Sequence, residues 1–253
     1  MSSRELLGVR IALVDYGSAM DAMDAMIATR ERGYVCAAAV HVVMTAQQDP
    51  ATLAALCGAS LVLPDGRPLV WALRALGDRL PDRVYGPELM RRYCSRCAER
   101  GHRVFLFGGY SPEAMETLER ALHERDPGIE IVGSWRPAYS SFDDLLDDGI
   151  AARLNDAKPD VVWVGLGAPR QELWMAAMRG RLDAPVLVGV GAAFDFLAGI
   201  KKQAPPWMQR AGLEWVHRFM QEPRRLGPRY LRHNPAFVVA VARQYRRERQ
   251  RII

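Results

Sequence analysis

Cysteine is scarce in this sequence, and the four cysteines follow no regular spacing. Small secreted domains held together by disulfides, and zinc-binding domains, carry cysteines in regularly spaced pairs. Here Cys94 and Cys97 form a single Cys-x-x-Cys inside a predicted helix, while Cys36 and Cys57 lie far away. Because a structural zinc ion needs four ligands, the sequence argues against both classes.

Long apolar runs are also missing. A membrane-spanning helix needs about 20 consecutive apolar residues, and stretches such as residues 235–242 fall far short of that. Residues 1–10 lack the apolar segment of a secretion signal. We therefore expect a cytoplasmic protein whose chain does not cross a membrane.

The sequence has no convincing metal site. The acidic run at 142–148 resembles an Asp-x-Asp motif, but Ser140 or Ser141 followed by Asp143 and Asp144 is typical of a helix start. We expect no metal and no cofactor, and no histidine chemistry. No metal or triad spacing involves any of the five histidines, which are His41, His102, His123, His217 and His233.

Short apolar runs alternate with helical stretches along most of the 253 residues. Strands that are apolar on both faces and separated by amphipathic helices are typical of a parallel sheet covered on both sides. The sequence thus predicts an α/β fold with a Rossmann-like, mainly parallel sheet between helices. The predicted strands are 9–15, a run ending at 64, 103–107, 129–133, 160–165 and 185–190.

Residues suited to chemistry follow several of these strands. Ligands of such sheets bind beyond the carboxyl ends of the strands, so we expect one pocket to collect these residues. The Gly-x-Gly sequences at 165 and 189 lack the third glycine of a dinucleotide fingerprint, which disfavours an NAD-dependent oxidoreductase. The strand-end residues are Asp65, Gly66, Gly108, Gly109, Gly165, Gly167, Gln171, Glu172, Gly189, Gly191 and Asp195.

Each of these positions has a functional and a structural interpretation. Burial at a strand end would raise the pKa of Asp65 toward that of a general base, whereas Pro-Asp-Gly is also ordinary turn chemistry. Gly108 and Gly109 present backbone N–H groups suited to a phosphate, or form a tight turn before a helix capped by Ser111.

The polar residues of the later strand ends also have alternatives. The Gln171 amide is suited to a uracil edge or a ribose hydroxyl, and Glu172 to the same role or to the helix dipole. Asp195 lies between two phenylalanines, so we expect a buried carboxylate that must find donors. In that case Asp195 would have a structural role.

The chain carries a net charge of +5, and its arginines gather in the C-terminal segment. An anionic lipid surface or a phosphate would suit this run, and a solvated helix is the structural alternative. No nucleic-acid-binding motif accompanies the charge. Only Glu222 and Glu248 accompany Arg218, Arg224, Arg225, Arg229, Arg232, Arg243, Arg246, Arg247, Arg249 and Arg251.

Taken in order, these motifs resemble the WecG/TagA/CpsF family of bacterial glycosyltransferases over nearly the whole chain. The resemblance implies transfer of a sugar, such as N-acetylmannosamine, a glucose-type sugar or a uronic acid, from a UDP-sugar to a polyprenyl-diphosphate-linked acceptor. It also implies inversion at the anomeric carbon and a role in cell-wall or exopolysaccharide synthesis. The blocks that carry it are residues 63–66, 83–89, 105–109, 165–172, 189–199, 204–208 and 212–218.

The same resemblance assigns roles to residues. Asp65 would be the catalytic base, and no divalent metal would be needed. Cationic side chains would then stabilise the leaving diphosphate, with Arg83, Arg218, Arg224 and Arg229 as candidates. Residues 1–213 would form the catalytic core and 214–253 an arginine-rich helical appendage. That appendage would close over the site and contact the inner face of the membrane; formation of a homo-oligomer is left open.

The chain departs from the family pattern at two places. Ala37, Ala38 and Ala39 stand where the family carries a Thr and an Asn, and Gln203 stands where it carries an Arg. Two hypotheses follow. One is an active UDP-sugar transferase, and the other is a catalytically weak homologue that binds a nucleotide sugar or serves as a partner subunit in a polysaccharide-synthesis complex.

Overall fold

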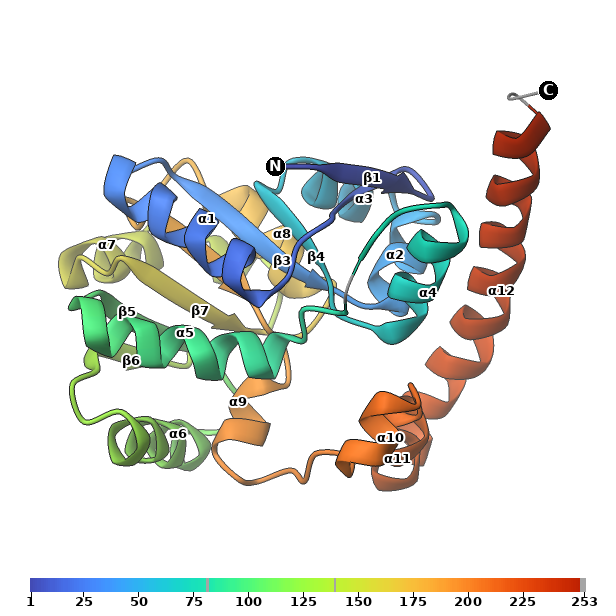
Figure 1. Ribbon diagram of the computed structural model, residues 1–253. Coiled ribbons are helices and arrows are strands. Elements are labelled where there is room, and N and C mark those ends of the chain that lie inside the picture. Colours follow the sequence, from blue (N-terminus) through green and yellow to red (C-terminus); the bar gives the residue numbers. More distant parts are fainter. Residues whose placement is uncertain (81, 139, 251–253) are drawn as a thin grey trace.

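A six-stranded, fully parallel sheet forms the centre of the protein, with the strand order β4-β3-β8-β7-β5-β6. The computed structural model describes residues 1–80, 82–138 and 140–250, except the side chains of Arg225 and Arg229. The α/β fold predicted from the sequence is confirmed (Figure 1). The strands of this sheet are β3 (Gly33–Ala38), β4 (Leu61–Pro64), β5 (Arg103–Gly108), β6 (Glu130–Trp135), β7 (Val161–Gly165) and β8 (Val186–Gly189).

Two strands differ from the sequence prediction. The run at 9–15 contributes β2 (Val9–Ala12), which pairs with β1 (Ser3–Leu6) in a separate antiparallel hairpin. Strand β3 was not predicted, although it lies between β4 and β8 and is buried along its whole length. Its sequence, Gly-Tyr-Val-Cys-Ala-Ala, has few of the β-branched residues that mark strands, and only its place inside the sheet makes it one.

Helices cover both faces of the sheet, because alternate strand residues point to opposite sides. Leu63, Leu106 and Trp163 pack with helices α1, α5 and α6 on one face. Phe107 and Val162 pack with α2, α3, α4, α7 and α8 on the other. These helices are α1 (Tyr16–Thr29), α2 (Val40–Ala46), α3 (Pro50–Cys57), α4 (Arg67–Ala75), α5 (Gly86–Arg100), α6 (Pro112–Arg125), α7 (Asp148–Ala157) and α8 (Arg170–Met178).

Local capping fixes where several elements begin. The Ser111 hydroxyl accepts a hydrogen bond from the Ala114 N–H at 3.2 Å, with Pro112 in the first turn of α6, as the sequence predicted. The predicted helix start near residue 143 is a short 3-10 turn, η1 (Asp143–Leu146). There the Asp144 carboxylate accepts the N–H groups of Ser140 and Ser141 at 2.7 and 2.8 Å, so this acidic residue serves the backbone.

The C-terminal segment is helical and basic. After α9 (Ala193–Leu197) come α10 (Pro206–Arg210), α11 (Glu214–Gln221) and the long α12 (Pro223–Gln250), which runs along the side of the domain (Figure 1). Phe237 of α12 is buried in the same apolar cluster as α2 and α4. Among the described residues no helix is long and apolar enough to span a bilayer.

Candidate active site

Two adjoining cavities open at the carboxyl ends of the strands. The large cavity, of about 520 Å³, is bordered by the loops that follow β3, β4, β5, β7 and β8. The small cavity, of about 100 Å³, lies between the loop after β4 and helices α11 and α12. Ala39, His41, Asp65 and Arg218 line both cavities, so Asp65 lies where the two meet.

Asp65 directly follows β4 and is held at both ends. Its backbone N–H donates to the Ala38 carbonyl at 3.0 Å, and its carboxylate Oδ1 accepts from the Gly86 N–H at 3.0 Å. Burial raises the pKa of Asp65 to about 6, against the opposing effects of the Arg83 charge and the Gly86 hydrogen bond. At neutral pH the group is therefore an ionised carboxylate that is more basic than an ordinary aspartate.

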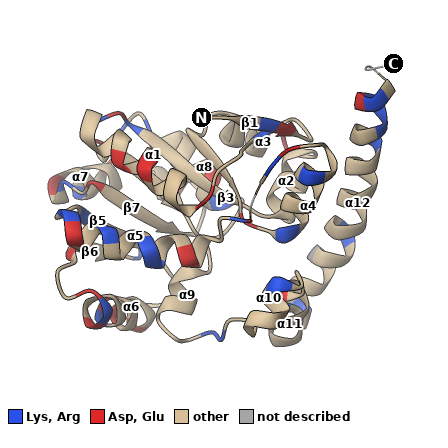
Figure 2. Cartoon of the chain, viewed as in Figure 1, with Lys and Arg blue, Asp and Glu red and all other residues tan. Residues whose placement is uncertain are grey.

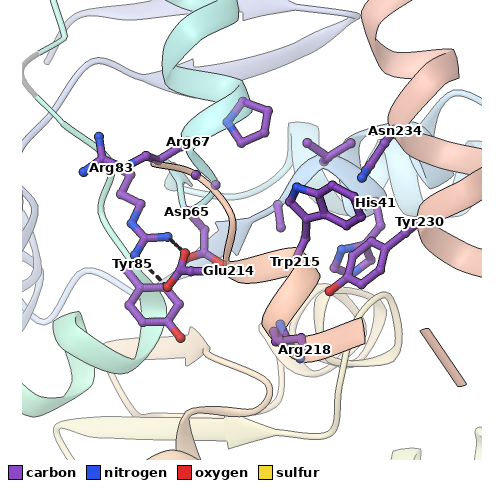
Figure 3. A pocket seen from close by; sticks show the side chains of 15 residues that line it. His41, Asp65, Arg67, Arg83, Tyr85, Glu214, Trp215, Arg218, Tyr230 and Asn234 are labelled. Carbon is purple, nitrogen blue, oxygen red and sulfur yellow. Dashed lines mark hydrogen bonds and ion pairs between the residues drawn. The ribbon is translucent and has the colours of Figure 1, made fainter. Parts of the chain in front are cut away.

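Arg83 is 7% exposed and forms a two-pronged ion pair with Glu214, the first residue of α11. One of its Nη atoms lies 2.9 Å from Glu214 Oε1, and the guanidinium lies over the Tyr85 ring at 4.3 Å. Figure 3 shows this pair beside Asp65, with Trp215 on the other side of the cavity. Arg83 thus lines the small cavity, but its charge is already balanced by a carboxylate from the C-terminal segment.

Glycines shape the floor of the large cavity. Gly109 and Gly167 line it and have φ values of +91° and +77°, which favour glycine. Gly108 does not line it; a Cβ there would lie 2.9 Å from the carbonyl of Gly165, so this glycine allows β5 and β7 to meet. The Gly109 N–H donates to the Gly165 carbonyl at 3.1 Å, so it is engaged in this turn.

Gln171 and Glu172, at the start of α8, are both buried. Gln171 lines the large cavity, and its amide donates to Glu172 Oε1 at 2.9 Å. Burial raises the pKa of Glu172 to about 7, although the Gln171 hydrogen bond opposes this. Within the described chain, Gln171 Oε1 and Glu172 Oε2 have no hydrogen-bond partner. Glu172 thus lies behind Gln171 rather than facing a ligand.

Three cationic side chains line the large cavity, namely Arg136, Lys201 and Arg218. Lys201 Nζ lies 2.8 Å from Asp195 and 3.0 Å from Glu222, so it links the core to the C-terminal segment. Asp195 also lines the cavity, where its side chain is 13% exposed, and Lys201 supplies the donor that such a largely buried carboxylate needs.

The other predicted arginines lie elsewhere. Arg224 is exposed and lines neither cavity. The side chain of Arg229 lies outside what the structure describes. In residues 1–80, 82–138 and 140–250 no group of three or more His, Cys, Asp or Glu side chains is arranged to hold a metal ion.

Several site residues were missed in the sequence. His41 lines both cavities, and its Nε2 is buried without a hydrogen-bond partner in the described chain. His41 reaches the site from helix α2 by itself, so it belongs to no triad or metal-ligand spacing that the sequence could display. Glu214 and Trp215 lie within a block that carried the family resemblance, which was the available signal. No motif in the sequence indicated Tyr230 and Asn234, which line the small cavity from α12 (Figure 3).

Alanines occupy the wall beneath Asp65. Ala37 and Ala39 line the large cavity, and Ala39 lines the small one too. Ala39 is the N-cap residue of α2 and makes no side-chain cap hydrogen bond. The departure noted in the sequence therefore falls on the cavity wall and leaves it apolar. Gln203, the other departure, is exposed and borders a neighbouring cavity with Arg83.

Comparison with known proteins gives a consistent match over this whole architecture. A sequence profile for the "Glycosyl transferase WecG/TagA/CpsF family" matches residues 4–251. An N-acetylglucosaminyldiphosphoundecaprenol N-acetyl-beta-D-mannosaminyltransferase of Bacillus spizizenii is 35% identical over 202 residues, 79% of this chain and 75% of that protein. The enzyme of the same name from Staphylococcus aureus strain MW2 is 31% identical over 215 residues, 85% of this chain and 81% of the relative.

Among solved structures, the Gly74Cys mutant of arylmalonate decarboxylase aligns with 76% of this chain and 79% of its own. Its TM-score is 0.25 and its identity 16%. This likeness carries no argument about fold or function.

Proposed function

This chain belongs to the WecG/TagA/CpsF family of glycosyl transferases, and we propose that it moves a sugar from a UDP-sugar to a polyprenyl-diphosphate-linked acceptor with inversion at the anomeric carbon. The relatives named above act on an acceptor of this kind. In this assignment the large cavity holds the UDP-sugar and the small cavity holds the acceptor.

The position of Asp65 at the junction of the two cavities carries the proposal. Its carboxylate takes the proton of the acceptor hydroxyl as that oxygen forms a bond to the anomeric carbon. The bond from this carbon to the UDP oxygen breaks on the opposite face, and its electron pair leaves with UDP. A pKa of about 6 keeps the base ionised at neutral pH while strengthening it.

The leaving diphosphate needs positive charge as its own charge develops. Arg136 and Arg218 line the cavity assigned to the donor and supply that charge from protein side chains, whereas Lys201 in the same cavity is already paired with Asp195 and Glu222. Arg218 also lines the acceptor cavity, so its charge lies near the junction where Asp65 is found. Under this proposal the reaction needs no divalent metal, and Gln171 contacts the nucleotide or its sugar through its unpartnered carbonyl oxygen.

The acceptor lipid places the reaction at a membrane surface. The exposed arginines of α12, including Arg243 and Arg247, give the helix a basic surface suited to anionic lipid headgroups (Figure 2). We assign the protein to the inner face of the cytoplasmic membrane, in cell-wall or exopolysaccharide synthesis.

A second function, as a nucleotide-sugar-binding subunit of such a pathway, is favoured by one observation. Ala37 and Ala39 leave the donor cavity without polar groups where the family pattern carries two. In that case UDP would bind and no sugar would be transferred.

Measurement of UDP release separates the two functions. The assay uses UDP-linked N-acetylmannosamine, N-acetylglucosamine, glucose and their uronic acids, with polyprenyl-diphosphate-linked sugars in liposomes. Acceptor-dependent release from one donor supports the transferase and identifies its sugar. Binding of UDP with no release from any donor contradicts it and supports the second function.

A further inference from the structure

An apolar groove, which we call the α4–α12 groove, runs between those two helices. Its volume of about 780 Å³ falls in the range of about 300–1,000 Å³ typical of ligand pockets. Trp71 and Val238, on its two walls, are 47% and 66% exposed. The groove is lined by Val40, Pro68, Trp71, Ala72, Ala75, Gly212, Trp215, Asn234, Phe237, Val238, Val241, Ala242, Tyr245 and Arg246.

The groove is continuous with the small cavity. Five residues line both, among them Val40 and Pro68 from the core and Trp215 from α11. Trp215 packs edge-on against Tyr230 at 5.8 Å between ring centres. A ligand seated in the groove would therefore have one end beside Asp65.

Helix α12 is fixed to the core on another side, so the groove does not depend on ligand to form. The Gln244 side chain accepts from the Leu7 N–H at 2.9 Å and donates to the Glu5 carbonyl at 2.9 Å. Arg232 donates to Gln48 at 2.7 Å, and Phe237 is 3% exposed. These contacts hold α12 and leave its Val238 and Ala242 positions facing the groove.

The distribution of charge along the groove and the small cavity favours an amphiphilic ligand. Among the described residues that line the groove, none is acidic and Arg246 is the charged one. At the other end, in the small cavity, lie Arg218 and the balanced pair of Arg83 and Glu214, next to Asp65. An apolar trough that leads to a cationic side chain beside the base fits a ligand with an apolar tail and an anionic head.

We infer that the α4–α12 groove binds the first isoprene units of the acceptor's polyprenyl chain, with the diphosphate toward Arg218 and the acceptor sugar at Asp65. The inference rests on the proposed function and extends it to the lipid. The groove then recognises the lipid tail, in addition to the recognition of the acceptor sugar in the small cavity. It holds the first isoprene units of the tail outside the bilayer, next to Asp65.

The test varies tail length without a membrane. Acceptor sugar diphosphates bearing a methyl group, or one, two or three isoprene units, are assayed below their micelle concentrations. We expect kcat/KM to rise with each unit and then level off once the groove is filled.

Variants on neighbouring positions of α12 provide the matched control. Val238→Gln changes a groove residue, and Val239→Gln changes the next residue, which is 48% exposed and does not line the groove. We expect Val238→Gln, and Ala242→Trp, which fills the groove, to lower kcat/KM for the three-unit acceptor by about tenfold. The methyl acceptor should be unaffected, and Val239→Gln should match the wild type with both. Thermal unfolding checks that each variant is folded.

Direct binding separates this inference from the proposed function. Farnesyl diphosphate and inorganic diphosphate are titrated by calorimetry, which needs no turnover. Tighter binding of farnesyl diphosphate that Val238→Gln removes supports the groove, even if no sugar is transferred and the proposed function fails. Three results would overturn it: rates and affinities that ignore the tail, equal losses in Val238→Gln and Val239→Gln, or a dimer in sedimentation that Val238→Gln dissociates.

Discussion

Arg83 and Glu214 join the two parts of the site, since a buried guanidinium beside Asp65 is paired with the first carboxylate of α11. Both charges act on Asp65: the Arg83 charge lowers its pKa, and Glu214 raises it. Loss of one partner of a buried ion pair costs about 3–5 kcal/mol. Attachment of the C-terminal segment to the core therefore depends on both partners being present, and the same pair shifts the pKa of Asp65.

The pH dependence of transfer should follow from this pair. Under the proposed function the carboxylate of Asp65 is the active form, so kcat should rise as the pH increases through about 6 and be level above it. Arg83→Gln removes the charge that lowers this pKa and should move the rising part of the pH profile of kcat to higher pH. Glu214→Gln should move it to lower pH. The same changes in the exposed ion pair of Arg103 and Glu130 serve as the control and should leave the pH profile unchanged. Shifts of the same sign in the Arg83 and Glu214 variants would contradict the assignment of the profile to Asp65.

Asp65→Asn should abolish transfer, with a loss of at least about a hundredfold in kcat, because a general base typically contributes 10²–10⁴. The amide keeps the shape of the carboxylate and its acceptor for the Gly86 N–H, so UDP affinity should change little. Single-turnover kinetics and UDP calorimetry measure the two effects. Transfer at a near wild-type rate would show that another group is the base.

Glu172 makes stability depend on pH. Its pKa in the folded protein is about 7 against an ordinary 4.5, so its contribution is fully present below about pH 4.5 and is lost as the pH rises through 7. Glu172→Gln keeps an acceptor for the Gln171 amide and has no such loss. Relative to the wild type, its free energy of unfolding should increase by about 2.5 kcal/mol from pH 5 to pH 8, at about 1.4 kcal/mol per pKa unit. Urea unfolding measures this, and an equal difference at both pH values, or the same change in the exposed Glu99→Gln variant, would refute it.

The alanines of the donor cavity should control donor choice. Changing Ala37→Thr and Ala39→Asn together adds two hydrogen-bonding groups to the wall, so the ratio of kcat/KM between an N-acetylated donor and a plain hexose donor should change by about tenfold or more. Ala39→Asn alone should also stabilise the fold by about 1 kcal/mol, since this residue is the uncapped start of α2. Ala54→Asn, on the exposed side of α3, is the control. An unchanged donor ratio would remove these positions from donor recognition.

The basic surface of α12 should bind anionic lipid. Arg243→Glu with Arg247→Glu should weaken binding to phosphatidylglycerol-containing vesicles by about tenfold or more, because each basic residue contributes about 1 kcal/mol. The double variant Arg120→Glu and Arg153→Glu makes the same change in net charge on exposed sites of α6 and α7. Co-sedimentation at low and high salt compares the two. Equal weakening would mean that net charge, and not α12, directs binding.

The sequence by itself determined the layered α/β architecture and the side of the sheet where the site lies. Apolar runs separated by helical stretches leave few other arrangements, and parallel strands bring their carboxyl ends to one edge. Asp65 could be placed there because it directly follows a strand, and Gln171 and Asp195 because each lies a few residues after one. The family resemblance then gave Asp65 a role that its local Pro-Asp-Gly turn left open.

Only the tertiary structure decided which distant residues meet. Arg83 and Glu214 are 131 residues apart, and no local pattern pairs them. The place of β3 in the sheet, the entry of His41 into both cavities and the groove between α4 and α12 likewise depend on how helices pack on the sheet. A chain's periodicity fixes which side of an element is apolar, whereas contacts between elements follow from the shapes that pack together, and these exist only once the chain has folded.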